Sequence, residues 1–185
     1  MIQYQWSGRG DKAPPASGRT TMSVDDINEI RQYLTFKLDN EVFALDVATV
    51  REVLDFTTVT KIPRTPEFMR GVINLRGSVV PVVDLRLAFG MSATEKTVNT
   101  CIIVVELRLE GETTIMGALA DSVEEVIDLE PDQIQPAPRI GTSIKTDFIR
   151  GMGKRETHFL MILDIDRVFS VDQLSNLRTS TPVAA

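Results

Sequence analysis

The stretch of sequence that decides the fold is FMRGVINLRGSVVPVVDL, residues 68–85. Its beginning returns 80 residues later as Phe148-Ile149-Arg150-Gly151, and its end returns without a gap at residues 160–165. A second echo joins residues 50–55 to residues 123–128, at a spacing of 73 residues. Repeats of this length indicate two copies of one small unit rather than a solenoid, whose period would be shorter. Two such units meet at a seam, which is a natural place for a partner to bind.

The composition is typical of a soluble globular protein. The chain has 185 residues, of which 43% are hydrophobic and 25% charged. A formal net charge of -6 disfavours nucleic-acid binding, because an acidic surface repels phosphates. No apolar run approaches the ~20 residues of a membrane span, and residues 1–6 lack the pattern of a secretory signal. The single cysteine, Cys101, excludes an internal disulfide framework and fits a reducing cytoplasm.

The two ends of the chain differ from its middle. Residues 1–31 begin with small, polar and proline-rich sequence that has little to bury, so we expect a flexible tail. A capping sequence at residues 23–26 favours a short helix over residues 24–31. Residues 172–177 are expected to form a terminal helix, followed by a frayed end over residues 178–185.

From residue 33 onward the pattern is typical of strands. Residues 33–38 and 42–45 predict a hairpin around Asp39-Asn40, and a second hairpin is predicted around Gly77-Ser78. Pro81 cannot donate a ladder hydrogen bond, which predicts an edge or a bulge at this position. The second half repeats the scheme, with predicted strands over residues 101–107, 113–118, 148–151 and 158–163.

Short helices are predicted between the strands. Apolar residues at helical spacing favour one helix over residues 47–54 and another over residues 122–127. A helical turn is predicted over residues 85–89, ended by Gly90. Asp84 and Asp164 each begin such a turn after a strand. We interpret them as N-cap residues rather than as a pair of catalytic acids.

Each half therefore has about five short strands, enough to curl into a small barrel. The predicted fold class is all-β with short helices. Barrel 1 covers about residues 33–97 and barrel 2 about residues 98–170, with an exchange of strands between them left open. Domains of ~60 residues are marginal alone, so the two units should pack through a shared core.

No enzyme chemistry is visible. Nucleophilic catalysis needs a nucleophile, a base and an orienting group, but the chain has one histidine and one cysteine. We interpret Cys101 as a buried, inert side chain and His158 as a solvated residue at a strand end. One His and one Cys cannot supply the usual zinc set. Gly151-Met152-Gly153 lacks the lysine of a phosphate loop and precedes a strand. We therefore predict no catalytic residue, no cofactor and no metal.

Glu52 and Arg76 leave two interpretations open. They could be exposed side chains that contribute little. Alternatively, they could border the seam between the units and present charge to a partner helix. The residues alone favour neither interpretation.

The central stretch, residues 68–86, closely resembles the signature of CheW, the family of bacterial chemotaxis coupling proteins. The resemblance extends over residues 32–177, with supporting stretches at residues 43–53 and 134–138. It implies two intertwined SH3-like five-stranded barrels and a non-catalytic adaptor. The implied partners are the regulatory domain of a CheA-type histidine kinase and the cytoplasmic helical hairpin of chemoreceptors (methyl-accepting chemotaxis proteins). The adaptor would be cytoplasmic and would reach membrane receptor arrays through these partners, without inserting into the membrane.

The resemblance also assigns contact residues by matching motif. The receptor contact falls on Val50, Glu52, Val53, Gly71 and Arg76, with Glu52 and Arg76 facing each other near the groove between the barrels. The kinase contact, which closes rings in the array, falls on Gln135, Arg139 and Ile140. Well-known members carry basic, acidic and aromatic side chains at these last three positions, and this chain departs from that pattern.

Two alternatives remain beside the chemotaxis adaptor. A CheW-like scaffold of another chemosensory system, serving pilus motility or surface sensing, would have the same fold. A small hydrolase would need turnover that depends on His158, which we do not expect. A specific kinase or receptor that co-purifies with the protein would separate the first alternative from a chemotaxis adaptor.

Overall fold

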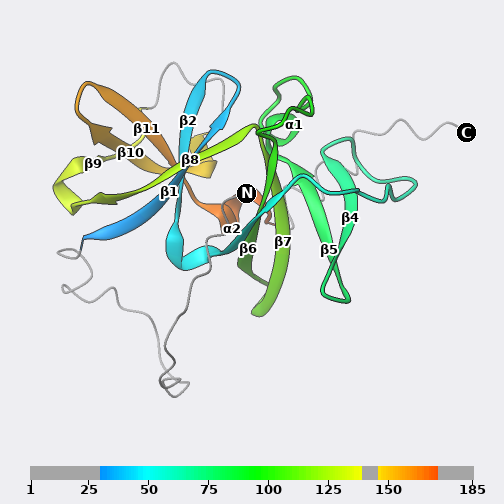
Figure 1. Ribbon diagram of the computed structural model, residues 1–185. Coiled ribbons are helices and arrows are strands. Elements are labelled where there is room, and N and C mark those ends of the chain that lie inside the picture. Colours follow the sequence, from blue (N-terminus) through cyan, green and yellow to red (C-terminus); the bar gives the residue numbers. More distant parts are fainter. Residues whose placement is uncertain (1–29, 139–145, 171–185) are drawn as a thin grey trace, which may run out of the picture.

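The computed structural model describes residues 30–138 and 146–170 (Figure 1). Its strands are β1 (Arg31–Leu38), β2 (Glu41–Asp46), β3 (Val50–Asp55), β4 (Met69–Leu75), β5 (Ser78–Asp84), β6 (Cys101–Leu109), β7 (Glu112–Ala120), β8 (Ser122–Leu129), β9 (Ile134–Gln135), β10 (Ile149–Arg155) and β11 (His158–Leu163). The short helical segments are η2 (Val47–Thr49), α1 (Leu85–Ala88), η3 (Pro131–Gln133), η4 (Thr146–Phe148) and α2 (Ile165–Val168). The predicted all-β class with short helices is confirmed.

The strands form two barrels that lie side by side in Figure 1. One sheet has the order β8-β1-β2-β11-β10-β9, and we call it the terminal barrel because it contains the first and last strands. The other has the order β3-β6-β7-β5-β4, and we call it the central barrel. Each barrel therefore takes strands from both halves of the chain.

The sheets do not divide the chain at residue 97. The β1–β2 hairpin leaves the first half, because β2 pairs in parallel with β11 of the second half. In return, the β6–β7 hairpin joins the first half through the parallel pairing of β7 with β5. The β1–β2 hairpin inserts between β8 and the β10–β11 hairpin. The β6–β7 hairpin inserts in the same way between β3 and the β4–β5 hairpin. The barrels are intertwined by this reciprocal exchange.

The repeat in the sequence is also a repeat in three dimensions. The unit β4, β5 and α1 corresponds to β10, β11 and α2, and a β-bulge before Gly71 has its counterpart before Gly151. The backbone N–H of Asp84 donates to the carbonyl of Phe68 at 2.7 Å, and that of Asp164 donates to the carbonyl of Phe148 at 2.9 Å. The two copies therefore share details of backbone geometry and not only strand order.

Two of the predicted helices are strands instead. Residues 47–54 contain a single 3-10 turn followed by β3, and residues 122–127 lie in β8. Each strand contains a bulge, after Val50 in β3 and after Val123 in β8. One extra residue lengthens the local apolar spacing from two residues to three, which imitates a helical period. At the N-terminal end, Arg31 already belongs to β1, so the predicted helix does not reach residue 31.

With the exception of Pro81, the other local predictions agree with the structure. Both predicted hairpins form, and the helical turn α1 ends before Gly90. Asp84 caps α1 by accepting hydrogen bonds from the backbone N–H groups of Arg86 and Leu87, and Asp164 caps α2 by accepting one from the backbone N–H of Arg167.

The prediction of an edge or a bulge at Pro81 is wrong, because β5 lies between β7 and β4 and Pro81 pairs in register with Val72 of β4. The parallel pairing of β5 with β7 covers only residues 82–84, so the proline stands just before it.

Three apolar clusters form the core. One fills the terminal barrel around Tyr33 and Ile162, a second fills the central barrel around Ile102 and Val104, and the third lies between the barrels. In the shared cluster a row of phenylalanines crosses the seam, with ring centroids 5.8–5.9 Å apart, in the order Phe36, Phe43, Phe89 and Phe148. The predicted shared core is therefore present, and its aromatic row joins the two barrels.

Some sequence predictions lie outside the described residues. These are the tail over residues 1–29, the terminal helix over residues 172–177, and the end over residues 178–185. Two of the predicted kinase-contact residues, Arg139 and Ile140, also lie outside them.

Candidate partner-binding surfaces

The β3 edge of the central barrel carries three of the five predicted receptor-contact residues. Val53 lies opposite Ile103 of the shared core, whereas Glu52 lies opposite Val104 of the barrel interior. Their side chains therefore point to opposite faces of β3. Because β3 is an edge strand, a partner that lies along this edge can reach both faces. Val53 is 42% exposed, and Val50 is half-buried against the shared core.

Glu52 and Arg76 form a two-pronged ion pair. Nη1 and Nη2 of Arg76 donate to Oε1 and Oε2 of Glu52 at 2.8 and 2.9 Å. Arg76 occupies the turn between β4 and β5, and β3 and β4 are the two edges of this sheet. The pair therefore bridges the open side of the central barrel. The hydrogen bond to Glu52 raises the pKa of Arg76, so this guanidinium stays charged. The Arg76 side chain is 75% exposed.

Gly71 shapes the backbone of this site and presents no side chain to it. It is buried with a φ of 139°, and a Cβ at this position would lie 2.1 Å from the carbonyl oxygen of Thr60. Thr60 and Val72 exchange backbone hydrogen bonds of 2.8 and 2.9 Å. Gly71 thus allows the connection between β3 and β4 to lie directly against β4. The structure brings Glu52 and Arg76 together on the surface and places Gly71 below it.

The terminal barrel carries a matching ion pair that sequence reasoning missed. Glu125 corresponds to Glu52 at the spacing of 73 residues, and its carboxylate accepts a hydrogen bond from Arg155. Position 156, which corresponds to Arg76, is Glu156, and its φ of 51° repeats the 50° of Arg76. The arginine therefore stands one residue earlier in this copy. Hydrogen bonding lowers the pKa of Glu125 and raises that of Arg155. The sequence feature that could have revealed this second pair is the glutamate that both copies carry, Glu52 and Glu125.

Val126 is a second residue that the repeat pointed to. It corresponds to Val53 at the spacing of 73 residues and is 51% exposed. Its cross-strand partner is Leu34 of the shared core, just as Ile103 is the partner of Val53. Both edge strands, β3 and β8, therefore present an exposed valine beside the seam between the barrels.

The predicted kinase contact begins on β9. Gln135 is exposed and pairs with Met152 of β10. In the central barrel, Thr60 forms the corresponding bridge with Val72, which precedes Met152 by 80 residues. The segment that follows Thr60 is therefore the structural counterpart of the segment that follows Gln135.

A surface pocket of 910 Å³ opens on this counterpart segment. Its lining is mainly apolar and includes Phe56, Ile62, Pro63, Pro66, Met69 and Leu87, with Lys61 and Arg64 among its basic residues. None of the predicted contact residues lines the pocket. The pocket adds a candidate docking surface at the end of the central barrel.

Features of an enzyme site are sparse in the described part of the chain. Oγ1 of Thr157 lies 2.9 Å from Nδ1 of His158, which is exposed at the start of β11. Cys101 is buried in the shared core, and desolvation raises its pKa to about 11. Residues 30–138 and 146–170 contain no cluster of three potential metal ligands. No helix among them has the length and apolar character of a membrane span.

Comparison with known proteins shows similarity to CheW proteins over most of the chain. The model of the CheW-like domain matches residues 32–173. The chain is 33% identical over 145 residues to the chemotaxis protein CheW of Klebsiella aerogenes, covering 78% of this chain and 85% of that protein. It is 32% identical over 143 residues to CheW of Rhizobium meliloti, covering 77% and 90%. The crystal structure of the scaffolding protein TtCheW from Thermoanaerobacter tengcongensis matches with a TM-score of 0.70 at 33% identity, covering 85% of this chain and 96% of that one.

Proposed function

Because this chain belongs to the CheW-like family, whose members are chemotaxis scaffold or adaptor proteins rather than enzymes, we propose that it couples chemoreceptors to a CheA-type histidine kinase by binding alone. The observation that carries the proposal is the β3 edge. There an exposed ion pair, Glu52 with Arg76, and the exposed apolar side chain of Val53 lie on opposite faces of the same edge strand, where a partner along that edge can contact both. We propose that the receptor binds this surface, as the family resemblance of the sequence implies.

The chemistry of the β3 edge suits a helical hairpin. An amphipathic helix binds through apolar side chains spaced along one face, and Val50 and Val53 supply the apolar contact from β3. Val126 borders the same seam from the terminal barrel. The guanidinium of Arg76 has five N–H donors, and two of its nitrogens bond Glu52. The remaining donors of this largely exposed group can bond a receptor carboxylate or carbonyl.

We propose that the kinase binds at the ends of the barrels. We place one contact at Gln135, beside β10 of the terminal barrel. Its structural counterpart after Thr60 carries the apolar pocket of the central barrel. An adaptor that closes rings with the barrel-shaped regulatory domain of a kinase needs two contacts, and the internal repeat supplies two related barrel ends. In this role the protein would work in the cytoplasm and reach receptor arrays through its partners.

An adaptor of this kind regulates by geometry. It holds receptor and kinase in one relative orientation, so that a ligand-driven shift of the receptor changes the activity of the kinase. Coupling of about 1–3 kcal/mol is the usual scale for such allosteric communication.

Replacing Arg76 by glutamate tests the receptor contact. We expect Arg76→Glu to weaken binding to a soluble receptor hairpin at least about tenfold and to abolish kinase activation, because the new carboxylate repels Glu52 and removes the guanidinium donors. The fold should persist, because an exposed ion pair contributes little to the stability of a folded protein. Binding is measured by titration calorimetry and activation by phosphate transfer in reconstituted arrays.

Arg155→Glu is the matched control for this experiment. It makes the same change of charge in the corresponding ion pair of the terminal barrel, away from the β3 edge. Receptor binding should stay within about twofold of the unmodified protein. Equal loss in both variants, or no loss in Arg76→Glu, would contradict the placement of the receptor on β3.

A further inference from the structure

The outer face of β10 and β11 is an exposed apolar surface with a basic edge. Lys154 lies opposite Phe159 and Met152 lies opposite Met161 in the cross-strand register. Residues directly opposite each other in a sheet project to the same side, and residues two apart along a strand do so as well. These four side chains therefore share one face, while the alternate residues of β11 fill the terminal barrel.

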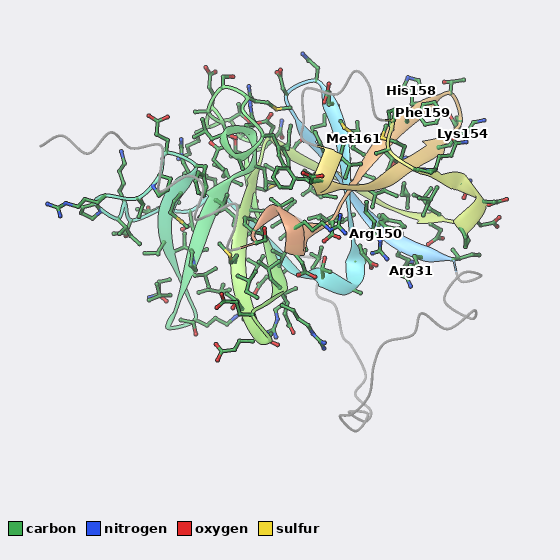
Figure 2. All side chains as sticks on the ribbon, turned by 180° about the vertical axis from the view of Figure 1, so that it is seen from behind. Arg31, Arg150, Lys154, His158, Phe159 and Met161 are labelled. Carbon is green, nitrogen blue, oxygen red and sulfur yellow. The ribbon has the colours of Figure 1, made fainter. Side chains whose placement is uncertain are left out.

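Phe159 is the exposed anchor of this face. Its side chain is 54% exposed, and it is the one aromatic residue among the exposed large hydrophobic residues of the described chain. Met152 and Met161 are half-buried against the shared core. They form an apolar floor that leads from the core toward Phe159. Figure 2 shows Phe159 and Lys154 together at the far end of the hairpin, with Met161 nearer the middle of the molecule.

The charge of this face differs from that of the protein as a whole. The chain has a formal net charge of -6, yet β10 and β11 contain no Asp or Glu. Arg150 and Arg155 of β10 face the carboxylates of Asp46 and Glu125. Within the described residues, no carboxylate lies at ion-pair distance from Lys154. Its ammonium group is therefore available to an acidic group of a partner.

The face is continuous with the kinase contact placed at Gln135. Gln135 pairs with Met152, and Met152 pairs with Met161, so these residues form one row across β9, β10 and β11. Adjacent strands lie about 4.8 Å apart, which makes the row about 10 Å long. Lys154 and Phe159 form the next row on the same side. A domain that docks on Gln135 would also cover this pair.

We propose that the kinase contact extends from Gln135 across the outer face of β10 and β11, with Phe159 as its apolar anchor and Lys154 as its charged contact. The occupant is the regulatory domain of the CheA-type kinase, presenting an apolar patch edged by a carboxylate. This inference rests on the proposed function. A large aromatic side chain supplies much of the affinity of a typical interface, and a charge at the rim mainly supplies association rate and specificity.

The test measures binding of the isolated kinase regulatory domain from the same organism to the full chain. Phe159→Ser should weaken binding about thirtyfold or more, because truncation of a hot-spot residue has an effect of that size. Phe159→Met should restore most of the affinity. Lys154→Glu should weaken binding about threefold at low salt, and the difference should shrink as salt screens the charges. Lys154→Arg should bind as the unmodified protein does.

Val98→Ser is the matched control, because Val98 is 99% exposed and lies in the loop between the repeats. It should leave kinase binding unchanged. Binding of a soluble receptor hairpin by every variant shows that the fold is intact. Unchanged kinase binding by Phe159→Ser and Lys154→Glu, with weakened binding by Gln135→Glu, would overturn the extension and leave the proposed function standing. No kinase binding by the unmodified protein would overturn both.

Discussion

At the scale of single residues, Gly71 shows how a missing side chain positions a site. Its Cα lies against the connection between β3 and β4. This connection carries Thr60 and continues into the residues that line the surface pocket. A Cβ would meet backbone atoms, which cannot swing away as the end of a side chain can. The glycine therefore helps to position both candidate surfaces of the central barrel, the β3 edge and the pocket, although it contacts no partner itself.

The effect of Gly71 can be separated from the general cost of a left-handed glycine. Gly71→Ala should destabilise the fold by about 3 kcal/mol or more, because a steric clash adds to backbone strain. Gly77→Ala is the control, since Gly77 has a φ of 85° and no atom within 4 Å of its added Cβ. It should cost only about 1–2 kcal/mol. Urea denaturation followed by circular dichroism gives both values, and equal losses would contradict the close approach of Thr60.

Cys101 gives a prediction for pH. Burial raises the pKa of its thiol from 9.0 to about 11. In the unfolded chain the thiol loses its proton near pH 9, whereas in the folded protein it keeps the proton until about pH 11. The unfolded state binds fewer protons in this window, so stability falls as pH rises from 9 to 11 and is unaffected below pH 9.

The thiol can be followed directly. At pH 8 a thiol reagent should label Cys101 only as fast as the protein opens, and denaturant should make labelling rapid. Cys101→Ala should lack the thiol's contribution to the loss of stability above pH 9. Rapid labelling of the native protein would show that Cys101 is accessible.

At the scale of elements, the two aspartates that occupy corresponding positions in the two copies of the repeat differ in burial. Asp84 is fully buried and accepts hydrogen bonds from the backbone N–H and the hydroxyl of Thr94, both at 2.9 Å, in addition to capping α1. Asp164 caps α2, and its side chain is 30% exposed. The first aspartate therefore ties the loop between the repeats to the central barrel.

Alanine at each position measures this difference. Asp84→Ala should cost about 2–4 kcal/mol, because it removes a cap and leaves buried donors without a partner. Asp164→Ala should cost about 1 kcal/mol, which is typical for an N-cap. Thermal unfolding of the two variants is the measurement. A larger loss at Asp164 would contradict the assigned networks.

The elements also show what the sequence could and could not predict. Hairpins around Asp39-Asn40 and Gly77-Ser78 followed from turn chemistry and alternation, which act locally. The strands β3 and β8 were mistaken for helices, because a bulge is chosen by pairing with a distant strand and disturbs the period of two. The pair of Glu125 and Arg155 was missed because the repeat alignment placed Glu156 opposite Arg76. The sequence does not show that the arginine is shifted by one residue between the two copies; this becomes clear only when the two turns are compared in the structure.

At the scale of the whole molecule, the exchange of hairpins could not follow from periodicity. Local patterns predict that residues 33–45 form a hairpin, but not which barrel the hairpin completes. That choice is made by parallel pairing of β2 with β11 and of β5 with β7, between strands far apart along the chain. The family resemblance implied the intertwining, while the repeat alone indicated only two similar units.

The reciprocal exchange has a consequence for the origin and the dissection of this protein. Two identical subunits that trade a hairpin form a domain-swapped dimer. The present chain has the form of such a dimer, fused through the loop between the repeats. Cleavage at Val98, which is 99% exposed, should therefore yield two fragments, residues 1–98 and 99–185, that each lack a complete barrel. Neither should give a cooperative melting transition alone, and their mixture should recover it as a one-to-one complex. Cooperative folding of either fragment by itself would show that one copy can close its own barrel.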